Sequence, residues 1–309
     1  MHNVKVTLVC KMMDSLRFVR LYDTMTKLNQ LELFVSEQKR KEVIGHASVS
    51  YHQASSILTP CGGSLKAFDY SLNPYMGCSF ACNYCYAAFF VDSEKDRANW
   101  GNWVKVKENA LQLLMKFRKK PLIDKSIYMS SATDPYQPIE RELELTRSLL
   151  VELIKYHKVR LVVQTRSPLA ARDIDLYKQF EAIQVNMTVT TDSEDVRKAF
   201  EPFCPSNKMR LKAIQQVQEA GIKTCISLSP LLPVEDPKQF AESLLETGAG
   251  KFTISTFHAD RGKFAAGTKD EALQLVKKMG WNDQKYQDTI QLLRKYLKIP
   301  EGKSGFGTV

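Results

Sequence analysis

Hydrophobic residues follow two different spacings along most of this chain of 309 residues. Residues 139–156 place Leu143, Leu150 and Ile154 on one stripe at helical spacing, whereas residues 160–164 form a short apolar run typical of a buried strand. Helices are predicted at 105–120, 139–156, 173–180, 208–220, 239–246, 270–279 and 282–297. Strands are predicted at 126–131, 160–164, 183–190, 223–232 and 252–257.

The alternation of strands with helices predicts parallel β/α units. Counting one more strand just before Cys78 gives about six strands, fewer than the eight of a closed barrel. We therefore expect an α/β fold, a partial (β/α)6 TIM-like barrel with additions at both ends. In such folds the reactive residues lie at the carboxyl ends of the strands.

Three segments are expected along the chain. They are an accessory segment, a core barrel, and a helical extension with a loose tail, at residues 1–45, 46–260 and 261–309. Within the accessory segment, a strand is predicted at 4–10 and a helix over 22–41. The stretch 45–71 is predicted to be a loop because Pro60 and the pair Gly62-Gly63 interrupt it.

Composition and charge narrow the class of protein. A hydrophobic fraction of 44% supports a sizeable core, and no apolar run approaches the roughly 20 residues that span a membrane. The first ten residues lack the pattern of a signal peptide, and seven cysteines do not make a disulfide scaffold, so a cytoplasmic location is expected. The net charge of +10, with basic clusters at 39–41 and 116–120, suits a polyanionic partner, although solvated helix faces also explain it.

Three cysteines are packed into one short run with the spacing Cys-x3-Cys-x2-Cys, at Cys78, Cys82 and Cys85. Three thiolates this close can hold three corners of a cubane iron–sulfur cluster, and one iron would stay open for another molecule. A structural zinc site is the alternative, but it needs a fourth Cys or His at matching spacing, and none is nearby. The remaining cysteines are scattered and are expected to be small buried residues: Cys10, Cys61, Cys204 and Cys225.

The cysteine motif resembles that of the radical SAM superfamily, because an aromatic residue, Tyr84, precedes the last cysteine and β/α units follow. The resemblance covers roughly residues 71–258. Within the superfamily the chain is similar to the spore photoproduct lyase-like branch. This similarity is carried by Asn73-Pro-Tyr-Met-Gly-Cys78, Ser130-Ser-Ala-Thr-Asp-Pro-Tyr-Gln-Pro138, Gln164-Thr-Arg-Ser-Pro168 and Glu201-Pro202.

The resemblance implies a 4Fe–4S cluster on Cys78, Cys82 and Cys85, with S-adenosylmethionine bound to the open iron. It also implies that one electron, from an external reductant such as flavodoxin or ferredoxin, leads to release of a 5′-deoxyadenosyl radical. That radical would abstract hydrogen from an unactivated C–H bond, while the protein positions the reactants and excludes water and oxygen.

Polar residues at the predicted strand ends are candidate cofactor contacts. Hydroxyl groups are offered by Ser130, Ser131, Thr133 and Thr188, and ordinary turn or sheet hydrogen bonds are the alternative for each. Arg166 ends the third strand, where the resemblance implies a lysine that meets the methionine carboxylate, and a guanidinium can bind a carboxylate bidentately. Arg210 opens a later helix and is a second candidate; a surface ion pair is the alternative for both arginines.

Tyr84 and Tyr86 correspond to two tyrosines that flank the last cluster cysteine in the lyase-like branch. We expect Tyr84 beside the adenine of the cofactor, with core packing as the alternative. Tyr86 is expected near the substrate as a relay of electrons or hydrogen, or simply packed. Asp134 is expected to cap the turn before Pro135.

Ser131 departs from the branch in an informative way. The resemblance places a hydrogen-donating cysteine of the lyase at this position, and a serine O–H bond is too strong to replace a thiol. Repair of thymine dimers by that mechanism is therefore not expected, although Cys225, in the predicted fifth strand, is an alternative donor.

Three functions stay open. The first is maturation of a ribosomally made precursor peptide: peptide-splicing relatives (spliceases) excise a tyramine unit and leave an α-keto-β-amino acid without a thiol donor, often with a small leader-recognition protein. The second is repair of a DNA or RNA lesion, which the net charge favours but no helix-turn-helix or zinc-finger signature supports. The third is a plain iron–sulfur electron carrier, which the open iron and a whole barrel disfavour.

Overall fold

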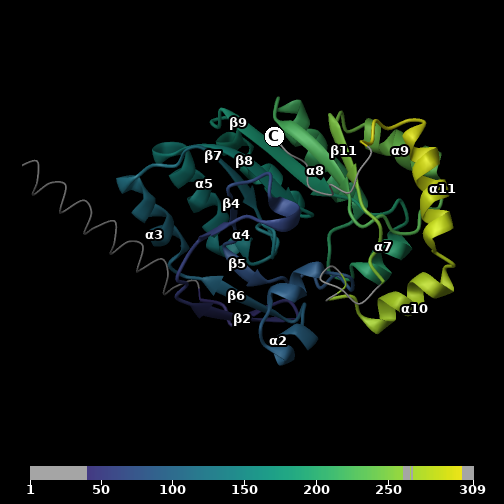
Figure 1. Cartoon of the computed structure of the whole chain (residues 1–309), viewed down its shortest axis with the longest axis horizontal. Coiled ribbons are helices and arrows are strands. Elements are labelled where there is room, and N and C mark those ends of the chain that lie inside the picture. The colour runs from purple at the N-terminus through teal and green to yellow at the C-terminus, as the bar shows by residue number, and fades with distance from the viewer. Residues whose placement is uncertain (1–39, 260–264, 266, 301–309) are drawn as a thin grey trace, which may run out of the picture. The chain divides into compact units, whose positions relative to one another are not determined.

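The computed structural model describes residues 40–259, 265 and 267–300, and the chain divides into two compact units, residues 1–42 and 43–309. Everything described below belongs to the unit that begins at Val43, an α/β structure (Figure 1). The strand predicted at 4–10, nearly all of the helix predicted at 22–41 and the predicted tail lie outside the described residues. The three-segment division of the chain stays a prediction.

Seven strands form the main sheet, in the order β11-β10-β9-β8-β7-β4-β3. Their bounds are β3 (Leu58–Pro60), β4 (Tyr70–Leu72), β7 (Ile123–Met129), β8 (Lys158–Thr165), β9 (Ala182–Thr188), β10 (Lys223–Leu228) and β11 (Lys251–Ile254). All neighbouring pairs from β4 to β11 are parallel, and β3 runs antiparallel to β4 at the edge. Six parallel strands in a sheet whose described edges do not pair confirm the predicted partial (β/α)6 barrel.

Helices lie in the connections between the parallel strands and after the last of them. Their bounds are α2 (Glu94–Ala98), α3 (Ala110–Met115), α4 (Glu140–Leu143), α5 (Leu145–Tyr156), α6 (Ile174–Tyr177), α7 (Glu194–Phe200), α8 (Asn207–Glu219), α9 (Pro237–Leu245), α10 (Asp270–Lys278) and α11 (Asp283–Arg294). Short 3-10 turns lie at Gly63–Leu65, Tyr86–Phe90, Lys116–Lys119 and Pro168–Asp173. The last two helices, yellow in Figure 1, follow β11, and α11 packs against α9. None of the helices in the described part of the chain is long and apolar enough to cross a membrane.

A second sheet of four strands was not predicted. Its order is β1-β2-β6-β5, with β1 (Val43–Ile44), β2 (Ala47–His52), β6 (Trp103–Lys107) and β5 (Tyr75–Gly77). The prediction of a loop over 45–71 is therefore wrong, since that stretch holds β2, β3 and the start of β4. The predicted helix from 105 begins only at Ala110, because Val104 and Val106 are buried on alternate positions of β6. This strand has only five residues and is followed almost at once by the helical spacing, so the sequence pattern did not separate the two elements.

The helix predicted over 139–156 is divided at Glu144, whose backbone is left-handed with a φ of 47°. The Glu140 carboxylate accepts hydrogen bonds from the backbone N–H groups of Thr146 (2.9 Å) and Arg147 (3.3 Å), and so caps the start of α5. Arg172 donates to the same carboxylate at 2.8 Å. The predicted single helix is therefore two helices, and the buried Glu140 carboxylate stabilises the break between them.

The two faces of the main sheet differ in chemistry. On one face, residues such as Leu161, Val163 and Val185 belong to the main hydrophobic core. The opposite face carries Gln164, Thr188 and other polar residues that line a cavity. The parallel strands therefore bring polar side chains together at their carboxyl ends, as predicted.

Candidate functional site

The three motif cysteines lie on a loop that leaves β5 at Gly77. A Cβ at this position would lie 2.5 Å from the carbonyl oxygen of Trp103, and the φ of 75° also favours glycine. The side chain of Gln137 accepts a hydrogen bond from the Ser79 N–H at 3.0 Å, and the Thr133 hydroxyl donates to the Gly77 carbonyl at 2.6 Å. The motif that follows β7 therefore fixes the start of the cysteine loop.

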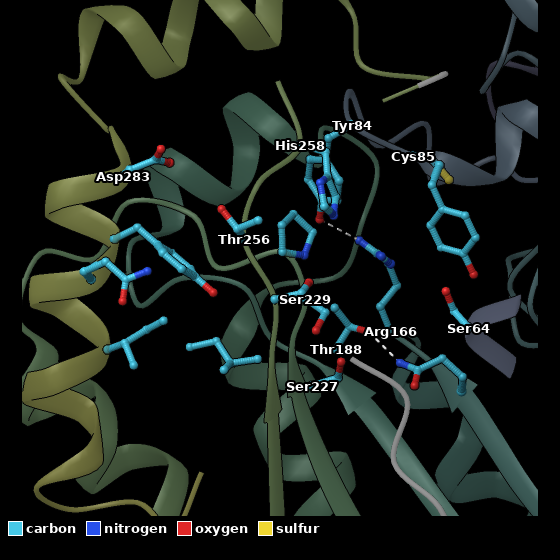
Figure 2. A pocket seen from close by; sticks show the side chains of 18 of the residues that line it. Ser64, Tyr84, Cys85, Arg166, Thr188, Ser227, Ser229, Thr256, His258 and Asp283 are labelled. Atoms are coloured by element: carbon cyan, nitrogen blue, oxygen red, sulfur yellow. Dashed lines mark hydrogen bonds between the residues drawn. The ribbon is translucent and has the colours of Figure 1, made fainter. Parts of the chain in front are cut away.

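A cavity of about 750 Å³ opens between the cysteine loop, the carboxyl ends of the strands and α11 (Figure 2). In Figure 2, Cys85 lies on one side, Asp283 of α11 lies on the opposite side, and Arg166, Thr188 and Ser227 lie between them. Small-molecule pockets commonly measure about 300–1,000 Å³. This cavity thus has room for a cofactor and part of a second molecule.

The three motif thiols are the candidate ligands of a cubane cluster. Cys78 and Cys82 are buried, and Cys85 is half-buried at the cavity wall. Each thiolate of a cubane cluster bonds a different iron. Burial raises the pKa of the Cys78 thiol, and raises that of Cys85 to about 12, so cluster binding must displace these protons.

A second thiol and a cation lie beside Cys82. The Sγ atoms of Cys82 and Cys204 are 3.6 Å apart, and Nη1 of Arg166 donates to the Cys82 sulfur at 3.0 Å. The contact with Cys204 and then the charge of Arg166 lower the pKa of Cys82, although burial opposes them. Because the thiolate is the form that binds metal, these surroundings suit the predicted ligand role.

A buried carboxylate, Glu201, holds Arg166 in place. Nη1 of Arg166 donates to Oε1 of Glu201 at 3.0 Å and to the Tyr84 hydroxyl at 3.0 Å. Arg210 donates to the other oxygen of Glu201 at 2.5 Å and is itself fully buried. Burial alone would raise the pKa of Glu201, but Arg210 and Arg166 hold it at about 2.

The backbone of Arg166 is fixed by Asp134. The Asp134 carboxylate accepts from the Arg166 N–H at 2.9 Å and from the Thr165 hydroxyl at 2.7 Å, which ties the end of β7 to the end of β8. It also accepts from the Tyr136 N–H at 2.9 Å, which is the predicted cap of the turn at Pro135. The Arg166 guanidinium thus reaches the cavity from a strand end that is held from two sides.

The predicted site residues fall into two groups. Those that line the cavity are Tyr84, Cys85, Tyr86, Arg166 and Thr188. Those that do not line it are Cys78, Cys82, Ser130, Ser131, Thr133 and Arg210. Ser131 accepts a hydrogen bond from Asn73 (3.3 Å) on its hydroxyl and one from Tyr86 (2.5 Å) on its carbonyl. The buried hydroxyl of Ser130 has no hydrogen-bond partner among the described residues, which is the condition of a group that a bound cofactor would complete.

Three parts of this site had no role in the sequence prediction: Glu201, Cys204 and the cavity face of α11. Glu201 stood out only through the dipeptide Glu201-Pro202, and nothing in the sequence links it to Arg166, which lies 35 residues earlier. The helix itself was predicted. Its apolar spacing indicates which side packs on the core, but not that the other side meets a cavity.

Comparison with known proteins agrees with this geometry. The profile of the radical SAM superfamily matches residues 72–246. An uncharacterized protein of Methanocaldococcus jannaschii is 41% identical over 164 residues, which cover 53% of this chain and 61% of that protein. An uncharacterized protein of Acidianus two-tailed virus is 27% identical over 189 residues, which cover 57% of this chain and 62% of that protein. The chain thus spans less than two thirds of the length of either relative.

A solved mutant of spore photoproduct lyase has a similar fold. The two structures superpose with a TM-score of 0.57, covering 80% of this chain and 78% of the lyase, at 15% sequence identity. Such low identity shows a shared fold and no more. Because the matched profile covers more than half of its length, the chain belongs to the radical SAM superfamily, whose members use a 4Fe–4S cluster and S-adenosylmethionine.

Proposed function

We propose that this chain holds a 4Fe–4S cluster on Cys78, Cys82 and Cys85, cleaves S-adenosylmethionine reductively, and abstracts hydrogen from a ribosomally made precursor peptide. The proposed outcome is excision of a tyramine unit, which leaves an α-keto-β-amino acid. One observation carries the chemistry: the cysteine loop forms a wall of the cavity at the carboxyl ends of the parallel strands, with Arg166 beside Cys82.

The residues of the chain itself would bind and orient the reactants. When bound, the cluster and S-adenosylmethionine supply the electron and the hydrogen-abstracting 5′-deoxyadenosyl group. Arg166 would bind the methionine carboxylate, since its guanidinium lines the cavity and is oriented by Glu201. Thr188 and the unpartnered hydroxyl of Ser130 are the proposed contacts to ribose or methionine.

The two tyrosines around the last cysteine receive separate proposed roles. The Tyr84 hydroxyl donates to Glu201, so one end of the ring is fixed and its face is offered to the adenine. Tyr86 lines the cavity and is the proposed relay near the substrate. Ser131, Thr133 and Arg210 would act indirectly, because none of them lines the cavity and each bonds within the protein.

A peptide is favoured over a nucleic-acid lesion by the distribution of thiols. Of the described residues that line the cavity, Cys85 is the only cysteine, and it is a proposed cluster ligand. Cys225 is fully buried on β10 and does not line the cavity. A repair reaction that ends with hydrogen donation from a thiol thus finds no donor there, whereas tyramine excision requires none.

Repair of a DNA or RNA lesion is the second candidate. A solved spore photoproduct lyase is complexed with a dinucleoside spore photoproduct, and the net charge of +10 here suits a nucleic acid. For the peptide function, the proposed partners are the precursor peptide, a small leader-recognition protein, and flavodoxin or ferredoxin as reductant, all in the cytoplasm.

Anaerobic reconstitution tests the proposal. The wild-type chain should form the brown chromophore of a four-iron centre and release 5′-deoxyadenosine, and a co-expressed candidate peptide should lose a mass near that of tyramine. Cys82→Ala should abolish both chromophore and release, whereas the matched control Cys61→Ala, at a half-buried cysteine outside the loop, should retain them. A colourless, zinc-loaded wild-type protein would refute the cluster assignment. An unchanged peptide together with activity on irradiated DNA would select the second candidate.

A further inference from the structure

One face of α11 closes the cavity on the side opposite the cysteines. The lining residues from this helix are Asp283, Tyr286, Gln287, Ile290 and Arg294. The last four residues follow Asp283 by three, four, seven and eleven positions, and this spacing places all five on one side of a helix. On the flank next to this face, Thr289 and Leu293 are buried, and the helix packs against α9. This packing holds the cavity-lining face of α11 in position.

The two ends of the cavity differ in what they can bind. The cysteine end takes the cofactor under the proposed function, on which this inference rests. Figure 2 shows Asp283 across the cavity from Cys85, with Arg166 and Thr188 between them. The α11 end is thus the part that is left for the molecule that loses hydrogen.

The cavity-lining face of α11 carries an acidic residue at one end, a basic residue at the other, and largely apolar side chains between them. Asp283 and Arg294 stand at opposite ends of the helix, about 16 Å apart along its axis. Neither side chain makes a hydrogen bond or an ion pair with another described residue. Between them lie the half-buried ring of Tyr286 and the buried Ile290, and Gln287 adds an amide that can donate and accept.

This charge pattern favours a peptide over a nucleic acid. A DNA or RNA strand along the face would bring phosphates toward the carboxylate of Asp283, which would repel them. A peptide segment presents amide groups for Gln287, an aromatic or apolar side chain for Tyr286, and an acidic side chain for Arg294.

We propose that α11 is the substrate-recognition wall of this enzyme and that it binds a peptide segment, with an aromatic side chain against Tyr286 and an acidic residue paired with Arg294. The ligand class follows from the order of groups along the helix. The position follows from the cavity that the helix shares with the cysteine loop.

Three probes test the assignment on the reconstituted full chain with S-adenosylmethionine. They are N-acetyl-tyrosyl-glutamate amide, N-acetyl-tyrosyl-lysine amide and a thymidine tetranucleotide, with dissociation constants from saturation-transfer NMR under nitrogen. The wild-type chain should bind the glutamate probe roughly two- to fivefold more tightly than the lysine probe, as expected for an exposed arginine–carboxylate pair. Arg294→Gln should remove this preference, and Arg294→Glu should reverse it.

Lys295→Glu is the matched control, because it makes the same charge change at the next residue, which does not line the cavity. It should keep the wild-type preference. Equal shifts in Arg294→Glu and Lys295→Glu, or no shift in either, would overturn the assignment of α11, as would a tetranucleotide that displaces the glutamate probe. Deoxyadenosine release by the wild-type chain reports separately on the cysteine end, so its absence counts against the proposed function and not against the wall.

Discussion

Replacing Glu201 with glutamine tests whether one buried carboxylate holds the arginines beside the cavity. The Glu201 side chain is fully buried and accepts from Arg166 at 3.0 Å, from Arg210 at 2.5 Å and from the Thr190 hydroxyl at 2.9 Å. Glutamine keeps the shape and one acceptor oxygen. It removes the charge and places an NH2 group where an oxygen had accepted, so two guanidinium groups lose their shared counter-charge.

The expected loss of stability follows from this burial. Removing one member of a buried ion pair costs about 3–5 kcal/mol, because the remaining charge stays desolvated. A chain of 309 residues unfolds with an entropy of about 0.65 kcal/mol/K, taking roughly 2.1 cal/mol/K per residue. Glu201→Gln should therefore lower the melting temperature by about 5–8 °C.

Circular dichroism melting under nitrogen measures this change. Glu194→Gln is the matched control, because Glu194 also pairs with an arginine on α7, Arg197 at 2.7 Å, but its side chain is 39% exposed. Glu194 is only half-buried, and Arg197 keeps its hydrogen bonds to the carbonyls of Glu201 and Cys204 when the Glu194 charge is removed. The control should therefore lose about 1 kcal/mol or less, and its melting temperature should fall by about 1–2 °C or less. Equal melting temperatures for the two variants would refute the argument that Glu201 is the buried counter-charge.

Three further predictions concern the cavity, the cysteine loop and the far end of the sheet. Arg166→Lys keeps the positive charge, but a single ammonium group cannot bond Cys82 and Glu201 while it also binds the methionine carboxylate. The KM for S-adenosylmethionine should therefore rise roughly tenfold in a deoxyadenosine-release assay, and an unchanged KM would contradict the proposed contact with the methionine carboxylate. Gly77→Ala places a Cβ 2.5 Å from a backbone oxygen, so iron bound after reconstitution should fall well below wild type, and a full iron content would show that the loop tolerates the change. Hydrogen bonds from Ser126 and Lys125 lower the pKa of Asp69 to about 2, so its contribution to stability is present above its ordinary pKa and is lost as pH falls from about 4 toward 2. Urea unfolding should show Asp69→Asn less stable by about 1 kcal/mol at pH 5 and equal to wild type near pH 2, and a gap that persists at the lower pH would exclude this cause.

The barrel could be predicted from the sequence because each of its longer parallel strands is visible as a pattern of neighbouring residues. A strand buried on both faces reads as a short apolar run, as at Leu161–Val163, and the helix that follows adds its own spacing. The smaller sheet has no comparable pattern in the sequence. Its strands have two to six residues, and β2 pairs with β6 about 55 residues later, at Ser48 and Trp103. Pairing over that distance depends on tertiary contacts that no local pattern contains.

The candidate site divides in the same way. The cysteine motif was readable because its three thiols lie within eight residues, so their spacing alone limits the chemistry. The surroundings of Cys82 were not readable, because Arg166 and Cys204 arrive from β8 and from the loop after α7. Arg210 shows the consequence: no local pattern indicated that its guanidinium donates to the buried carboxylate of Glu201.

The contacts of the cysteine loop explain why motifs so far apart in the sequence belong together. Its start is held by Gln137 from the segment after β7, and its end is held by Asn83, whose N–H donates to the carbonyl of Phe200 on α7 at 2.9 Å. Between them, Cys82 meets Arg166 at the end of β8. Three successive β/α units thus hold one loop, and none of these contacts is available until the parallel strands have paired. The barrel therefore does more than carry the cysteines: the order of its strands determines which charged and polar groups surround each thiol.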